Sequence, residues 1–190
     1  LLCGNLRLLV LLQNGQTLLL QLVAQGQLLR LGAGTQRGQA IHELLGYPNV
    51  DLPLVDERDP ETLVVRIRGG AYKERIRHED RIPVSRGVMG AAVRERRTQV
   101  VNDVAADPRY VQPPSGISVR AELAVPILHA GRPLGVVNVE GEGPFTEVDV
   151  QLLELVADHL AVAHENTRLF AQERRLAVLE ERQRLARDLH

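Results

Sequence analysis

His190 is the last residue of the chain. In the segment that ends there, residues 173–190, more than half of the side chains are charged, Gln or His. A neutral imidazole nitrogen exposed on a helix is nucleophilic near neutral pH and can attack the terminal phosphorus of ATP in line. Arg187, three residues back, would share the helix face of His190, whereas Asp188 would lie about 200° around the helix. His190 is therefore a candidate nucleophile.

Cysteine and histidine usage gives little support to other chemistry. The single cysteine, Cys3, excludes a disulfide within the chain and a multi-cysteine metal site built by one chain. An axial haem ligand would have to come from the histidines, but no spacing among them singles out a haem or metal ligand. The candidates are His78, His129, His159 and His164. We predict no metal site, and the cofactor stays unknown.

Composition excludes several partners. The formal net charge of -1 gives no electrostatic case for nucleic acid or an anionic membrane. The chain has no Trp, two Phe and three Tyr, too few aromatic residues for base-stacking surfaces, so we predict no nucleic-acid binding. Residues 1–24 are leucine-rich, but polar residues interrupt any run long enough to span a bilayer. We expect a cytoplasmic protein, and a membrane anchor upstream of residue 1 stays open.

The elements that would position these residues can be predicted from periodicity and turn residues. A broken helix is expected over residues 18–45, a hairpin over 49–55 and 62–68, a short helix over 87–96 and a brief strand at 100–101. Residues 103–118 have the composition of a long loop and are a candidate lid.

The second half of the chain predicts a further hairpin and a long helix. Strands over 119–128 and 133–140 are joined by a turn with Gly131, where a positive backbone angle is needed. Thr146 is the expected N-cap of a helix that continues to the end, and Asp149 completes a capping box. This order of elements predicts an α+β fold with one antiparallel sheet. Three parts are expected: a helical lead-in (1–19), a sheet domain (20–170) and the start of a dimerisation helix (171–190).

Several segments together resemble the GAF domain family, and the resemblance covers roughly residues 20–170. They are 45–50, 82–84, 87–90, 100–104, 122–127, 135–139 and 145–149. The resemblance implies a sensor of small molecules or cofactors, with a five- or six-stranded antiparallel sheet, helices mainly on one face and a ligand site on the other. It also implies Tyr110, Arg120 and Asn138 as candidate ligand-binding residues.

Two known ligand classes of GAF domains are not supported. Phe145 and Asp149 stand at the spacing found in cyclic-nucleotide-binding members, but the Lys and the final Glu of that pattern are absent. We expect Phe145 to fill the core and Asp149 to support the helix N-cap. A covalently attached bilin would need a cysteine within the domain, and Cys3 lies outside it.

The segment from Glu181 to His190 resembles the phosphoacceptor motif of bacterial two-component histidine kinases of the nitrate-sensor type. The resemblance implies that His190 is the phosphoacceptor, that ATP serves the full-length parent, and that a response regulator is its partner. A heptad seam through Leu169, Leu176 and Gln183 to His190 predicts a parallel homodimer through this helix.

Other functions stay open at this point. The chain shows nothing like an ATP-binding domain, so it would not phosphorylate itself alone. A GAF input domain of a serine/threonine phosphatase regulator would have a similar charged linker. A non-enzymatic ligand-binding dimerisation module is the third reading, although it gives the polar helix beyond Phe170 no purpose.

Overall fold

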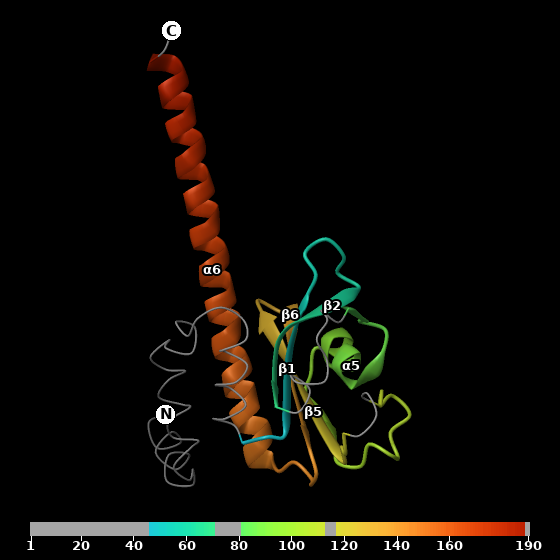
Figure 1. Cartoon of the computed structure of the whole chain (residues 1–190). Coiled ribbons are helices and arrows are strands. Elements are labelled where there is room, and N and C mark those ends of the chain that lie inside the picture. The colour runs from blue at the N-terminus through green and yellow to red at the C-terminus, as the bar shows by residue number, and fades with distance from the viewer. Residues whose placement is uncertain (1–45, 71–80, 113–116, 189–190) are drawn as a thin grey trace, which may run out of the picture.

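The computed structural model describes residues 46–70, 81–112 and 117–188, which form one six-stranded antiparallel sheet and two helices (Figure 1). The strands lie in the order β3-β2-β1-β6-β5-β4. Their bounds are β1 Asn49–Val55, β2 Thr62–Gly70, β3 Arg81–Pro83, β4 Gln99–Val101, β5 Ala121–His129 and β6 Arg132–Gly141. The helices are α5, Gly87–Glu95, and α6, Glu147–Asp188. The predicted fold class is therefore confirmed.

Each face of the sheet packs against a different described helix. Successive strand residues point to opposite faces, so Leu123 and Ala124 of β5 enter different hydrophobic clusters. The cluster with Leu123 includes Leu153 and Val156 of α6, and the cluster with Ala124 includes Val88 and others from α5. Below, these are called the α6 face and the α5 face of the sheet.

Local backbone features fit the two predicted hairpins. At the β5–β6 turn Ala130 and Gly131 both have positive φ, 48° and 76°, the conformation that a tight two-residue hairpin requires. β1 pairs with β2, and its register shifts between Leu52 and Pro53, where a proline without an N–H can be tolerated in a strand. Both hairpins and the short helix were correctly predicted from sequence.

α6 leaves the sheet domain as one unbroken helix of 42 residues, about 63 Å at 1.5 Å per residue. Its N-terminus is closed by the predicted capping box: the Thr146 N–H donates to Asp149 Oδ2 (2.7 Å) and the Asp149 N–H donates to Thr146 Oγ1 (3.4 Å). Figure 1 shows its C-terminal part projecting well past the sheet. Among the described residues, no helix combines the length and apolar character needed to cross a membrane.

Some predictions lie outside the described residues. These are the broken helix over 18–45, the part of the candidate lid at 113–116, and His190 itself. Phe145 is buried in the α6-face core, as predicted.

Candidate functional site

A set of polar side chains is buried on the α5 face of the sheet. On β1, β5 and β6 these residues alternate with side chains that pack toward α6, so they point toward α5 and the loop after β4. On β4, Gln99 lies opposite Ala124 of the α5-face cluster. The set comprises Asn49, Asp51, Gln99, Glu122, Asn138 and Glu140. Because buried polar groups are costly unless they bind something, this face is the candidate site.

Two carboxylates lie at its centre. Glu122 of β5 and Glu140 of β6 are directly opposite each other in the antiparallel ladder, and both are buried. Desolvation by burial and then the charge of Glu140 raise the pKa of Glu122 to about 8, while a hydrogen bond with Asn138 acts in the opposite direction. At neutral pH Glu122 is therefore held largely in its protonated form.

Amide side chains flank these two carboxylates. Asn138 lies opposite Ala124 of β5 and Asp51 of β1, and it is only 2% exposed. Asn49 of β1 lies opposite Glu140 and is equally buried. The Oδ1 atoms of both asparagines are buried, and neither accepts a hydrogen bond from any residue that the structure describes. They are acceptors ready for a donor from outside the chain.

Asp51 of β1 forms an ion pair with a cationic side chain of β2. Its Oδ1 accepts a hydrogen bond from Arg68 Nε on β2 at 2.9 Å, and both side chains are largely buried. This ion pair lies at the β1–β2 edge of the cluster.

Tyr110, in the loop after β4, lies on the other side of the cluster. Its side chain packs against the α5-face core, and its buried hydroxyl group has no hydrogen-bond partner among residues 46–70, 81–112 and 117–188. Burial, followed by the charges of Glu140 and Glu122, raises the pKa of the Tyr110 hydroxyl above its ordinary value. The hydroxyl therefore lies within the electrostatic field of the two carboxylates.

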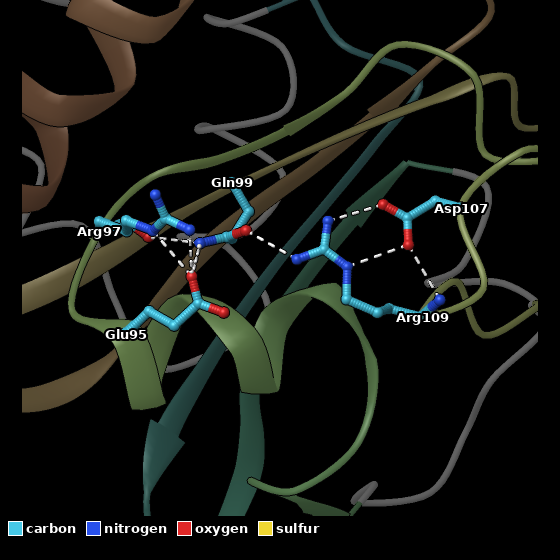
Figure 2. A network of polar contacts seen from close by, with 5 residues as sticks. All are labelled: Glu95, Arg97, Gln99, Asp107 and Arg109. Carbon is cyan, nitrogen blue, oxygen red and sulfur yellow. Dashed lines mark hydrogen bonds and ion pairs between the residues drawn. The ribbon is translucent and has the colours of Figure 1, made fainter.

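A polar network next to Tyr110 holds this loop in place (Figure 2). The Arg109 guanidinium donates to both carboxylate oxygens of Asp107, at 3.0 and 2.6 Å, and to Gln99 Oε1 on β4 at 2.8 Å. Gln99 Nε2 in turn donates to Glu95 Oε2 at the end of α5, at 3.1 Å. Hydrogen bonds thus link Arg109, the residue before Tyr110, to β4 directly and to α5 through Gln99.

The structure brings together two of the three predicted ligand residues. Asn138 belongs to the buried set, and the partly buried Tyr110 lies beside it. The Arg120 side chain is exposed, and only its backbone is bound within this region, through Val104 and Gly141. Its predicted role in ligand binding stays a prediction.

Sequence reasoning missed Glu122, Glu140 and Asp51. β5 is apolar along nearly its whole length, which is typical of a strand buried on both faces. A glutamate within such a strand must be buried whichever face it occupies. That signal could have identified Glu122.

Several polar contacts join the sheet domain to α6, among them one from the Thr98 hydroxyl, just before β4, to Glu154 Oε1 at 2.6 Å. The Tyr47 hydroxyl, just before β1, donates to Asp149 Oδ1 in the first turn of α6 at 2.5 Å. Arg132, in the β5–β6 hairpin that carries Glu122 and Glu140, contacts Glu165 of α6 at 3.2 Å. Glu165 also accepts a hydrogen bond from Arg168 at 2.8 Å, and this bond lowers the pKa of Glu165.

Beyond the sheet, α6 exposes a line of apolar residues at seven-residue intervals. Val148, Val162, Leu169 and Leu176 are each at least two-fifths exposed, and Leu155 continues the same spacing. Residues seven apart lie on nearly the same side of a helix.

The chain belongs to the GAF domain family, because a GAF domain family model matches residues 32–165. It is thus a sensory domain of the small-molecule-binding type. The predicted boundaries at residues 19 and 170 stay predictions. No curated protein matches the chain significantly.

Solved structures share the fold. The chain is 32% identical to a free methionine-R-sulfoxide reductase from Neisseria meningitidis in complex with its substrate, with a TM-score of 0.59 over 68% of this chain and 74% of that chain. It is 18% identical to the GAF domain of a phosphoenolpyruvate-protein phosphotransferase from Coxiella burnetii, with a TM-score of 0.70 over 84% and 99%. It is 22% identical to part of a methyl-accepting chemotaxis protein, with a TM-score of 0.59 over 70% and 87%.

Proposed function

We propose that this chain is the sensory input region of a two-component histidine kinase, in which a small molecule bound at the GAF domain controls phosphorylation of His190. The observation that carries the proposal is the continuity of α6. It starts against the sheet at Glu147 and remains helical to Asp188, within the segment that resembles the phosphoacceptor motif. A continuous helix can transmit a small rotation or shift over its whole length.

The candidate ligand site has a direct mechanical link to that helix. Glu122 and Glu140 lie on β5 and β6, and Arg132 of the same hairpin contacts Glu165 on α6. A ligand that moves these two strands would change the Arg132–Glu165 contact. The Tyr47–Asp149 hydrogen bond offers a second link, from β1 to the first turn of α6.

The proposal includes a homodimer through α6. An isolated helix as polar as residues 173–188 gains stability by pairing, since little of it packs on its own domain. The exposed line from Val148 to Leu176 supplies the apolar seam, and it extends the seam predicted from sequence toward the sheet domain. In the full-length parent, a cytoplasmic response regulator would receive the phosphoryl group.

A reductase is the alternative function that the 32% identity favours. A thiol-based reduction of a sulfoxide would need a cysteine at the ligand. The only cysteine of this chain, Cys3, lies outside the matched residues 32–165. We therefore infer that the chain keeps a ligand-binding role and not thiol-based reductase chemistry.

The test is phosphorylation of the parent protein by labelled ATP. We expect one acid-labile, base-stable phosphate per chain, mapped to His190 and lost in His190→Gln. The gene sequence after His190 should encode an acidic residue and, further on, a Gly-rich ATP lid. A downstream phosphatase domain, or no catalytic domain, would instead select the phosphatase-regulator or the dimerisation-module reading.

A further inference from the structure

We propose that the buried polar cluster on the α5 face binds an organic ammonium ligand, with the ammonium group placed between Glu122, Asn138 and Tyr110. The inference deepens the proposed function by naming the ligand class of the same site. It rests on the proposed function because it takes this cluster to be the ligand site of the sensory domain.

The charge distribution around Glu122 favours a cation. Its largest electrostatic neighbours are the carboxylates of Glu140, Asp107 and Asp51. Two arginines of the described part of this region are already engaged, Arg68 with Asp51 and Arg109 with Asp107. An anionic ligand would add a further negative charge to a buried group of carboxylates, whereas a cation would relieve their repulsion.

The hydrogen-bonding groups favour a donor-rich cation. Asn138 Oδ1 and Asn49 Oδ1 are buried acceptors with no partner in the protein, and they lie beside Glu122 and Glu140 respectively. The Tyr110 hydroxyl group is buried without a partner as well, and its oxygen can accept. An ammonium group donates up to three hydrogen bonds, so it can satisfy the Glu122 carboxylate, the Asn138 amide oxygen and the Tyr110 oxygen at once.

Such binding would be coupled to a proton. Among the residues that the structure describes, the charged or titratable groups near Glu122 are Asp51 on β1, Arg68 on β2, Glu140 on β6, and Asp107, Arg109 and Tyr110 in the loop after β4. Glu122 holds its proton at neutral pH, and an ammonium group binds better to the ionised carboxylate. The cation would therefore displace about one proton, and its affinity would rise with pH up to about 8.

The experiment titrates the 190-residue chain with matched probes by calorimetry and thermal shift. The probes are the free proteinogenic amino acids, methyl- to butylammonium chloride, and the N-acetyl derivatives of the same amino acids, which lack the cation. We expect at least one ammonium probe to bind and its N-acetyl or neutral counterpart to fail. Its affinity should rise up to about tenfold per pH unit between pH 6 and 7.5, with release of up to one proton per site.

Glu122→Gln is the test variant, because it keeps the shape of the side chain and removes its charge. It should weaken the ammonium probe at least about tenfold at pH 8 and flatten the pH profile. Glu142→Gln, at an exposed glutamate just after β6, is the matched control and should bind normally. A fully folded Glu122→Gln with unchanged affinity would overturn the proposal.

Other outcomes would also overturn the inference. These are preferential binding of an anion, binding of Mg²⁺ or Ca²⁺ alone, or binding of the N-acetyl derivative as tightly as the free amino acid. Each would leave the proposed sensory function intact, since a ligand would still bind the domain. A chain that binds no probe would count against the ammonium ligand, whereas failure of His190 to gain phosphate in the parent would count against the kinase function alone.

Discussion

Glu122 and Glu140 lie directly opposite each other on neighbouring antiparallel strands, with both carboxylates buried. Like-charged side chains in this position are destabilising when both are ionised. The burial of Glu122 and the charge of Glu140 therefore keep Glu122 largely protonated near neutral pH. Several measurable consequences follow from this pair and from the contacts that connect it with α6.

The first prediction concerns the dependence of stability on pH. The pKa of Glu122 is raised to about 8 in the folded chain, so between about pH 4.5 and 8 the folded state holds a proton that the unfolded state has lost. This group therefore makes the free energy of unfolding fall as pH rises through that range, by roughly 1 kcal/mol per pH unit. Glu122→Gln should remove this contribution and be the more stable protein at pH 8.

Urea unfolding at several pH values measures the difference between wild type and Glu122→Gln, with Glu142→Gln as the control. The difference in unfolding free energy between wild type and Glu142→Gln should not change with pH. A wild type and a Glu122→Gln variant whose stabilities run parallel from pH 5 to 8 would show that Glu122 does not hold its proton in the folded domain.

The second prediction concerns the loop that carries Tyr110. Arg109→Gln removes the hydrogen bonds to Asp107 and the bond to Gln99, so amide hydrogen exchange should rise over residues 104–111. Because these side chains are partly exposed, the loss in unfolding free energy should stay below about 1 kcal/mol. Arg97→Gln, which removes an exposed ion pair with Glu95, should leave the exchange of this loop unchanged.

The third prediction concerns the contact between the β5–β6 hairpin and α6. A double-mutant cycle with Arg132→Ala and Glu165→Ala should give a coupling of about 0.2–1 kcal/mol, since Arg132 is two-thirds exposed while Glu165 is buried. In the parent protein both single variants should reduce the ligand response of phosphorylation. A coupling of zero together with a normal ligand response would remove this contact from the signalling route.

The fourth prediction concerns the dimer. Replacing both Leu169 and Leu176 by Glu places four carboxylates in the seam of a two-chain assembly, so light scattering should report a monomer. Val178→Glu is the control, because Val178 is equally exposed but lies about 200° around the helix from Leu176. A monomeric wild type, or dissociation by the control as well, would contradict pairing through this seam.

Local sequence signals predicted most of the described elements. The β5–β6 turn needed Gly131 at a positive φ, and the Thr146–Asp149 box set the start of α6. These features depend on residues close together in the chain. A few neighbouring residues therefore determine their geometry, so they can be predicted from short stretches of sequence.

The site was harder to predict because it depends on which residues meet across the sheet. The resemblance to a family suggested Tyr110 and Asn138, whose role in ligand binding stays a prediction, but the pairing of Glu122 with Glu140 depends on the register of β5 against β6. Alternation alone suggests that a glutamate in a strand faces solvent. Here α5 and the following loop cover that second face, so the rule fails at the position that matters for the ligand.

The central claim is that α6 carries a rotation or shift from the GAF domain to His190, and residue insertions in α6 of the parent protein test it most directly. Seven residues inserted after Ala171 preserve the heptad phase, whereas two residues turn the distal helix by about 200°. We predict that the seven-residue insertion keeps the rate of His190 phosphorylation within about threefold of wild type, and that the two-residue insertion changes it at least about tenfold. Equal rates in the two variants would show that α6 is only a tether and would contradict the account.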